Sequence, residues 1–582
     1  MELTTTGIAP TPEEQAAVDA AIGPVATDSG GRVAREGLRA ARERRHLLLP
    51  ALLAVQQRIG WVSREALDYV CERLLVPLAE AYGVATFYSL IATEPRPPLV
   101  LHVCDDVACL ARGAGRACEE LERRWGPEGS GDKATWHRSP CLGRCDTAPA
   151  ALLQRAGPGL GPALEHVTAG PLESLLRGAD PHPSVLGSHR STVAATRPRT
   201  AALHSALTRG PEGVIAEVEA SGLVGRGGAA FPTGRKWAAV AGETGRKYVV
   251  ANGDESEPGT FKDRKLMGDD PFAVIEAMTI AGFAVGAEHG LVYVRGEYPE
   301  AAERLEEAVT ACRASRLLGD DVAGAGFAFD VEIRRGGGAY VCGEETALFE
   351  SVEGRRGEPR SKPPFPTSVG LFGRPTLVNN VETLLAVAGI VEEGAAAHRA
   401  VGTAGSPGHK LFCVSGSVRR PAVLEVEFGI RLGELVDRAG GLDPGRSVVA
   451  ILLGGAAGSF VGRESLDLEL SYEGVREAGL TLGSGAVVVF DDTVDLGPVV
   501  ARIARFFREE SCGQCVPCRV GTVRQEESLR RLLAGGDLEA EDAHLADLER
   551  AMRDASICGL GQMAGSAVRS ALRLGLVPGG RP

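Results

Sequence analysis

Two groups of cysteines constrain this chain more than any other feature of its sequence. The 582 residues include 13 cysteines, and the first segment, MELTTTGIAPTPEEQ, has neither the basic region nor the apolar core expected of a secretory signal. Without such a signal, cysteines indicate metal or redox chemistry rather than disulfides. Each group is expected to hold one metal centre: Cys104, Cys109, Cys141 and Cys145 form the first, and Cys512, Cys515, Cys518 and Cys558 form the second.

The first group lies in two short segments, with four residues between the cysteines of one and three between those of the other. Thiolates are the usual ligands of [2Fe–2S] clusters, and each segment can hold one side of such a cluster. A zinc ion is the alternative, because a tetrahedral shell of four sulfurs suits zinc and iron alike. The spacing leaves both open, and we prefer the cluster.

The second group begins with the crowded pattern C-x2-C-x2-C, in SCGQCVPCRVGT, and ends with a distant cysteine in SICGLGQ. Three thiolates within seven residues at a helix start can bind one corner of a cubane, which the fourth completes. A zinc ion needs fewer ligands so close together, so we predict a [4Fe–4S] cluster. The other cysteines are expected to be small core residues: Cys71, Cys118, Cys312, Cys342 and Cys413.

Four polar, glycine-rich segments follow one another in the middle of the chain. Glycine lets the backbone approach a phosphate or a flat ring, and ligands of α/β sheets lie where strands end. Taken singly, such segments are more often turns, with solvated acids and with asparagines that cap helices. Four in succession favour a cofactor site: SGLVGRGGAAFPTGRKW (221–237), YVVANGDESEPGTFKDR (248–264), GGGAYVCGEETALFESVEGRRGEPRSKPPFP (336–366) and VNNVETL (378–384).

Composition argues against several other kinds of protein. The net charge is −13, with charges of both signs, so a nucleic acid is not an expected partner. We find no run of the about 18 apolar residues that a membrane-spanning helix needs, so direct membrane insertion is not expected.

The residues around the first cysteine group resemble a known family. YGVATFY (82–88), VCDDVACLARGA and CLGRCDTAPA are similar to the [2Fe–2S] subunit of the NADH module of respiratory complex I, over about 35–170. From about 200 to 570, the glycine-rich segments and the second cysteine group resemble the FMN- and NADH-binding flavoprotein subunit of the same module. Such a fusion also resembles the beta (diaphorase) subunit of NAD-dependent formate dehydrogenase.

This resemblance implies a multidomain α/β fold: a helical bundle plus a thioredoxin-like domain, then an α/β domain, a ubiquitin-like domain and a helical domain. The expected parts are a flexible lead-in (1–34), the helical bundle (35–93), a thioredoxin-like [2Fe–2S] domain (94–170), a linker (171–199), an FMN- and NADH-binding α/β domain (200–400), a ubiquitin-like domain (405–494), to which no chemistry is assigned, and a helical [4Fe–4S] domain (495–582).

The resemblance also implies the cofactor contacts. It places FMN against Gly225, Gly227, Lys236, Asn252, Asp254, Gly343, Glu344, Asn379, Asn380 and Thr383. It places NADH against Phe231, Glu257, Glu345, Lys362 and Phe365, with Glu345 as a positioning group and no side chain as general acid or base. The family usually has glycine where this chain has Ala230, and we expect binding to survive that change.

The implied activity is that of an NADH dehydrogenase (diaphorase) subunit. It passes a hydride between NAD(H) and FMN, and single electrons between FMN and one [2Fe–2S] and one [4Fe–4S] cluster, because a flavin exchanges both pairs and single electrons. A non-enzymatic zinc-binding scaffold is the alternative from a different class. The expected partners are other iron–sulfur subunits, and the expected location is the cytoplasm, at the inner membrane only through those subunits.

The physiological complex has three candidates. The first is a complex I-type NADH:quinone oxidoreductase, and the second is a soluble NAD-dependent formate dehydrogenase, which the fusion slightly favours. The third, an NAD-reducing hydrogenase, is less favoured because its relatives tend to carry a loop closer to EGDPGAFMDR than to the ESEPGTFKDR found here.

Overall fold

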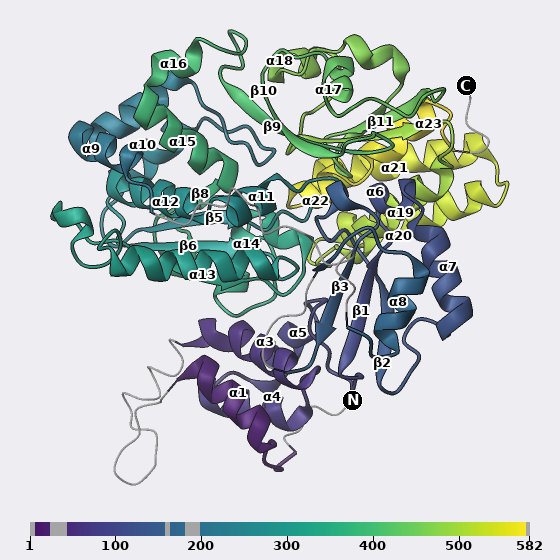
Figure 1. Ribbon diagram of the computed structural model, residues 1–582, viewed down its shortest axis with the longest axis horizontal. Helices are drawn as coiled ribbons and strands as arrows, with labels where there is room; N and C mark the ends of the chain where they lie inside the picture. Colours follow the sequence, from purple (N-terminus) through teal and green to yellow (C-terminus); the bar gives the residue numbers. More distant parts are fainter. Residues whose placement is uncertain (1–5, 24–43, 158–162, 181–197, 578–582) are drawn as a thin grey trace.

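The computed structural model describes residues 6–23, 44–157, 163–180 and 198–577. Figure 1 shows a central α/β domain flanked by an N-terminal helical bundle, a small sheet domain, a second sheet domain and a C-terminal group of helices. One continuous apolar core includes residues of the bundle, the central domain, the second sheet domain and the C-terminal helices. The predicted multidomain α/β fold is confirmed.

The N-terminal bundle starts earlier than the sequence suggested. Thr11 and Glu14 form a capping box at the start of α1, and Val18 and Ile22 of this helix are buried in the core. Part of the predicted flexible lead-in is therefore an ordered helix, while 24–43 lies outside the described residues. The elements are α1 (Pro12–Ile22), η1 (Arg45–Leu47), α3 (Leu48–Ile59), α4 (Arg64–Leu74) and α5 (Leu78–Ala85).

The first sheet domain has the strand order β2-β1-β3-β4, with β1 parallel to β2 and antiparallel to β3. Its last helix runs past the predicted boundary at residue 170, because Leu172, Leu175 and Leu176 are buried in the core of this domain. The elements are β1 (Leu99–Cys104), α6 (Val107–Ala111), α7 (Ala114–Trp125), β2 (Ala134–Ser139), η2 (Cys145–Thr147), β3 (Ala151–Arg155), β4 (Ala163–Leu164) and α8 (Ala169–Leu176).

The central domain has a parallel sheet of order β7-β6-β5-β8. The chain moves outward from β5 to β7 and then returns to place β8 on the other side of β5. The carboxyl ends of β5 and β8 therefore form a topological switch point, where α/β sheets bind ligands. Alternate strand residues face two cores: Val249 packs in the core that includes α12 and α15, and Val250 packs in the core that includes α14.

The helices of the central domain lie around its sheet (Figure 1). In chain order, the elements of this domain are α9 (Ala201–Ser221), α10 (Thr233–Gly242), β5 (Tyr248–Gly253), α11 (Lys262–Asp269), α12 (Pro271–Val285), β6 (His289–Val294), α13 (Pro299–Ala314), η3 (Val322–Gly324), β7 (Asp330–Arg335), η4 (Tyr340–Gly343), α14 (Glu345–Val352), η5 (Leu371–Gly373), β8 (Thr376–Asn380), α15 (Val381–Glu393) and α16 (Ala395–Arg399).

The second sheet domain has the order β10-β9-β13-β11-β12, and β13 is parallel to β9 while the other pairs are antiparallel. Its elements are β9 (His409–Gly416), β10 (Ala422–Glu427), α17 (Leu432–Arg438), β11 (Val448–Leu453), β12 (Ser459–Val461), η6 (Arg463–Asp467), α18 (Tyr472–Glu477) and β13 (Ala486–Asp491).

The C-terminal helices place cysteines at two helix starts. Cys515 is the N-cap of α20, Cys518 lies in its first turn, and Cys558 is the N-cap of α22. The first N–H groups of a helix have no partner within it and favour negative charge nearby. The elements are α19 (Leu496–Glu509), α20 (Val516–Leu533), α21 (Leu538–Ala555), α22 (Gly559–Met563) and α23 (Ser566–Arg573).

Candidate functional site

The first cysteine group comes together at one end of the first sheet. All four thiols are buried, and the Sγ atoms of Cys141 and Cys145 are 3.6 Å apart. Hydrogen bonds to Cys109 and Cys141 raise the pKa of the Cys104 thiol, so these side chains are in contact. The Gly143 N–H points to the Cys141 sulfur at 3.4 Å, the type of contact that tunes a cluster. Four converging buried thiols fit a [2Fe–2S] cluster.

Two arginines of the central domain hold the loops of this cysteine group. Arg295 donates to the Cys141 carbonyl at 2.7 Å and to the Glu255 carbonyl at 2.8 Å. Arg264 donates to the Gly143 carbonyl at 2.9 Å. Because Glu255 also lines the central cavity described below, the first cysteine group is fixed directly against the wall of that cavity.

The second cysteine group lies nearer the surface. Burial raises the pKa of Cys518 to about 12, and the charges of Cys515, Cys558 and Cys512 add to this effect, which places the four side chains close together. A Cβ added at Gly561 would lie 2.8 Å from the Cys518 Cβ, so the glycine lets α22 pack on the first turn of α20. This arrangement of three clustered thiols and one distant thiol fits a [4Fe–4S] cluster.

A cavity of about 460 Å³ lies at the switch point between the carboxyl ends of β5 and β8. Asn252 and Asn380 are register partners on these two strands, and both line the cavity. A Cβ at Gly227 would lie only 3.1 Å from the Asn380 Cβ, so glycine lets this segment pack closely against Asn380. Amide groups beside bare backbone fit the ribityl chain and phosphate of FMN. The cavity also reaches Cys558 of the second cysteine group.

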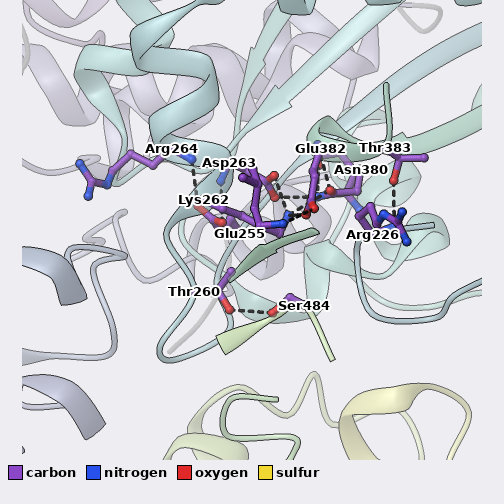
Figure 2. A network of polar contacts seen from close by, with 12 residues as sticks. Arg226, Glu255, Thr260, Lys262, Asp263, Arg264, Asn380, Glu382, Thr383 and Ser484 are labelled. Carbon is purple, nitrogen blue, oxygen red and sulfur yellow. Dashed lines mark hydrogen bonds and ion pairs between the residues drawn. The ribbon is translucent and has the colours of Figure 1, made fainter. Parts of the chain in front are cut away.

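A buried ionic network supports this wall of the cavity (Figure 2). Lys262 Nζ contacts Asp263 Oδ1 at 2.8 Å, Glu382 Oε2 at 3.1 Å and Asn380 Oδ1 at 3.1 Å, and its side chain is fully buried. Burial alone would raise the pKa of Glu382, but Lys410 and Lys262 hold it below its ordinary value. The network therefore keeps its charges paired and fixes the Asn380 side chain.

Glu382 also connects the cavity wall to the second sheet domain. Its Oε1 accepts the Leu411 N–H at 2.9 Å, and its Oε2 lies 3.4 Å from Lys410 Nζ. Burial lowers the pKa of Lys410 to about 8, although Glu382 opposes that shift. Thr260 and Ser484 make a further contact across this boundary, at 2.7 Å (Figure 2).

Three of the side chains predicted to hold NADH, Phe231, Glu345 and Lys362, are linked through Lys236 and Glu344, and Glu344 lines the cavity. Lys362 Nζ contacts Glu345 Oε1 at 2.7 Å and Glu344 Oε1 at 2.9 Å. Lys236 Nζ contacts Glu345 Oε2 at 3.4 Å and lies 5.7 Å from the centre of the Phe231 ring. Phe231 and Phe365 are 50% and 58% exposed, which leaves their rings free to stack on an adenine.

The predicted flavin residues divide into two sets. Those that line the cavity are Gly227, Asn252, Asp254, Gly343, Glu344 and Asn380, and the predicted NADH residue Glu257 lines it too. The others support the wall from behind. Asn379 accepts the Trp237 N–H at 2.9 Å, Thr383 accepts the Arg226 backbone N–H at 2.9 Å, and Lys236 Nζ donates to the Val378 carbonyl at 3.2 Å. The Gly225 N–H donates to the Phe231 carbonyl at 2.9 Å.

The structure adds wall residues that the sequence analysis missed. Tyr340 lines the cavity, and so do residues of the second sheet domain, among them Gly454, Ala457, Gly483 and Ser484. That domain was assigned no chemistry, yet it closes one side of the cavity. The glycine-rich turns GGAAGS and TLGSGA were the available signal, being of the same kind as the four segments singled out in the central domain.

Ala230 has a positive φ of 50°. A side chain in the left-handed region costs roughly 1–2 kcal/mol, so glycine is the natural choice at this turn and alanine is tolerated.

Four family models match consecutive parts of the chain. They are the thioredoxin-like [2Fe–2S] ferredoxin (34–177), the Nuo51 FMN-binding domain (218–389), the SLBB domain (410–489) and the NADH-ubiquinone oxidoreductase-F iron–sulfur binding region (498–574). They name iron–sulfur domains around both cysteine groups, and the chain carries FMN, one [2Fe–2S] and one [4Fe–4S] cluster and uses NADH.

Individual relatives agree with the family models. The F 2 subunit of NADH-quinone oxidoreductase from Rhizobium meliloti is 45% identical over 62% of this chain and 87% of its own length. The F subunit of the same enzyme from Aquifex aeolicus is 41% identical over 64% of this chain and 86% of its own length. One chain of the air-oxidised NAD+-reducing [NiFe]-hydrogenase matches this chain with a TM-score of 0.77 and 33% identity. The match covers 90% of this chain and 91% of the hydrogenase chain.

Within the described ranges, no helix is both long and apolar enough to cross a membrane. The similarity to the F subunits spans most of each such relative, and the additional N-terminal part matches the [2Fe–2S] ferredoxin model. The chain thus belongs to the family of NADH-quinone oxidoreductase F subunits, here fused to a thioredoxin-like [2Fe–2S] domain, and is an NADH dehydrogenase flavoprotein subunit.

Proposed function

We propose that this chain oxidises NADH beside the central cavity and delivers single electrons, through its second cysteine group, to another iron–sulfur subunit of a complex I-type NADH:quinone oxidoreductase. The observation that carries the proposal is the composition of the cavity wall. Asn252, Asn380 and Gly227 form one part of it, and Cys558 forms another. A group bound in this cavity therefore lies directly against a ligand of the [4Fe–4S] cluster.

The residues of the chain bind and orient, while FMN, when bound, supplies the conversion between paired and single electrons. Asn252 holds the cofactor through its amide, and Asn380, whose amide is bonded to Lys262 and Asp263, forms the fixed wall beside it. The glycine-rich segment at 225–228 lets the cofactor approach the backbone. Phe231 and Phe365 receive the adenine, and the Lys362–Glu345 pair contacts the ribose region of NADH. Acidic groups at a ribose favour NAD over NADP, because they repel a 2′-phosphate.

The surface near the second cysteine group fits an electron exit. Val516, Val520 and Ile557 are 58%, 47% and 40% exposed and lie next to the cysteines in sequence. Exposed apolar side chains gathered around a redox centre are typical of a protein contact. We propose that the partner iron–sulfur subunit docks over these residues.

The test is anaerobic titration of the reconstituted chain with NADH, followed by gentle affinity purification of the tagged chain from its own cells. The proposal expects flavin absorbance to fall with one equivalent of NADH, and expects quinone-reducing membrane subunits among the bound proteins. If NADH leaves the flavin oxidised, the site assignment fails. If molybdenum or tungsten arrives with a soluble catalytic subunit, a formate dehydrogenase-type complex replaces the proposed one.

An NAD+-reducing hydrogenase is the second candidate, and one observation supports it. The NAD+-reducing [NiFe]-hydrogenase chain covers 90% of this chain, whereas the F subunits from Rhizobium meliloti and Aquifex aeolicus cover 62% and 64%. The fusion of both modules is therefore shared with a hydrogenase. The same purification separates the two candidates, because nickel in the bound fraction identifies a hydrogenase partner.

Replacing Phe365 with alanine is expected to raise KM for NADH about tenfold and to leave kcat within about twofold, because a stacking contact binds the ground and transition states alike. Steady-state kinetics with an artificial acceptor measures both constants. Val369→Ala removes a nearby exposed side chain, 44% exposed, and should change neither. An unchanged KM in Phe365→Ala would show that this ring does not contact the nucleotide.

A further inference from the structure

A second cavity, of about 210 Å³, adjoins the first one. It lies between the first sheet domain, the end of β6 and helix α19, and its lining includes His137, Glu297 and Glu510. Tyr340 and Ser256 line both cavities. These two residues therefore form the partition between the proposed NADH-oxidising site and a separate polar space.

Tyr340 is held rigidly in this partition. Its hydroxyl donates to Glu257 Oε2 at 2.5 Å, and its backbone N–H donates to Glu510 Oε2 at 2.8 Å. Its ring packs edge-on against Phe506, with the ring centres 5.0 Å apart. The other carboxylate oxygen of Glu257 accepts the Ala457 N–H at 2.8 Å. A carboxyl group of the first cavity is thus joined by one hydrogen bond to a hydroxyl of the partition.

The far end of the second cavity reaches solvent. His137 and Glu128 line this end, with His137 Nδ1 3.6 Å from Glu128 Oε1, and the Glu128 side chain is 42% exposed. The lining also includes Arg96, Arg138, Arg295, Glu297, Glu510, the ring of His102 and Cys141 of the first cysteine group. A polar space of this volume has room for several hydrogen-bonded waters.

The chemistry of the reaction requires an exit of this kind. Oxidation of NADH to NAD+ yields two electrons and one proton. The iron–sulfur clusters carry the electrons away one at a time and carry no proton. One proton for each NADH must therefore leave the first cavity by another route, and a chain of hydrogen-bonded groups is the usual means.

We propose that Glu257 accepts this proton and that the Tyr340 hydroxyl passes it into the second cavity, from which it reaches solvent beside Glu128. When the Glu257 carboxylate gains the proton, it stops accepting from the Tyr340 hydroxyl, which turns its hydrogen toward the second cavity. Glu257 then gives its proton to the Tyr340 oxygen while the hydroxyl releases its own proton to the second cavity. Both groups return to their starting states, so no further reactant is consumed. This inference rests on the proposed function, since it assigns the proton to the same nucleotide site.

Other acids of the first cavity are occupied in other ways. Glu255 accepts the backbone N–H groups of Asp263 and Arg264, at 2.7 and 2.9 Å. Asp263 is paired with Lys262. Asp254 accepts the Ser256 hydroxyl at 3.4 Å, and Glu344 is paired with Lys362. Among the acids that line the first cavity, Glu257 is therefore the one that accepts the Tyr340 hydroxyl. Burial raises its pKa to about 7, a value at which a carboxyl group can both accept and release a proton near neutral pH.

The test compares Tyr340→Phe with Tyr69→Phe in the full chain, loaded with its cofactors. Both changes remove one hydroxyl, and the Tyr69 hydroxyl lies in the N-terminal bundle, bonded to Asp19 at 2.9 Å. Stopped-flow mixing with NADH follows flavin absorbance, and an indicator dye in weak buffer follows proton release during turnover with a one-electron acceptor. We expect proton release in Tyr340→Phe to lag about tenfold behind the flavin bleaching of the same variant, whereas in Tyr69→Phe the two rates should keep their wild-type ratio.

Two further readouts separate proton transfer from a structural effect. The solvent isotope effect on turnover should rise in Tyr340→Phe and stay unchanged in Tyr69→Phe. The acidic limb of the kcat profile should move to higher pH, because the Tyr340 hydrogen bond lowers the pKa of Glu257 and its loss raises that pKa. The route is overturned if Tyr340→Phe matches the wild type in its proton release, its solvent isotope effect and its pH profile.

An infrared difference spectrum keeps the proposal testable if Tyr340→Phe loses its cofactor. In the wild-type chain, a protonated-carboxyl band should accompany turnover with NADH, and Glu257→Gln should remove it. Absence of that band in the wild type overturns the role of Glu257. If NADH fails to bleach the wild-type flavin at all, the proposed function itself is wrong, so the two failures are distinguishable.

Discussion

Replacing Cys558 with alanine is expected to abolish electron delivery to the partner subunit, by about 100-fold or more, while NADH still bleaches the flavin. Cys558 lines the central cavity and belongs to the second cysteine group. Without the fourth thiolate the cubane loses its closing ligand, and the cofactor in the cavity loses the electron acceptor whose ligand lines that cavity. Electron paramagnetic resonance of the NADH-reduced chain and partner reduction in a reconstituted complex measure the two effects.

Cys71→Ala is the matched control, because Cys71 lies partly exposed in α4, outside both cysteine groups. It should retain both cluster signals and full electron delivery. Retention of the [4Fe–4S] signal and of partner reduction in Cys558→Ala would contradict the assignment of this residue as a ligand. Loss of flavin bleaching together with the cluster would instead show that Cys558 supports the cavity itself.

Replacing Lys262 with methionine is expected to destabilise the central domain by about 3–5 kcal/mol and to release its FMN, because the change leaves buried carboxylates without their cation. Lys262 is fully buried against Asp263 and Glu382. Burial would lower the pKa of its amine, but these two acids raise that pKa above its ordinary value, so the amine is charged. Denaturant titration followed by FMN fluorescence measures the loss.

Lys133→Met is the control, because Lys133 is exposed in the first sheet domain and the same substitution there should shift the transition by less than about 0.5 kcal/mol. If Lys262→Met and the wild type unfold at the same denaturant concentration, the network does not hold the cavity wall. If Lys262→Met keeps the wild-type stability but loses FMN, Lys262 contributes to cofactor binding and not to the stability of the fold.

The cysteine patterns were accessible to sequence analysis because their meaning is local. Three thiols within seven residues must lie close together wherever the segment is placed. The polar segment after the run YVVANG likewise signalled a strand end, and β5 does end at Gly253. Element boundaries were less accessible, since the short α1 and α8 depend on burying Val18 and Leu172 against other elements.

The composition of the cavity wall was outside the reach of local pattern. Asn252 and Asn380 lie 128 residues apart and meet only because β8 returns beside β5. Glu257 meets Ala457, 200 residues away, through the packing of the second sheet domain against the central one. The glycine-rich turn at 454–459 was a visible signal, but the same pattern occurs in turns that face solvent, so the sequence did not show which cavity it lines.

Residue types at short spacing determined the two cysteine groups and the four glycine-rich segments, and the resemblance of these motifs to a known family implied the domain types and the cofactors. Only the tertiary structure decided which segments share one cavity, that Cys558 reaches it, and that Tyr340 divides it from a second one. The physical reason is that short-range spacing constrains a helix, a strand or a ligand loop, whereas contacts between distant loops depend on how complete domains pack.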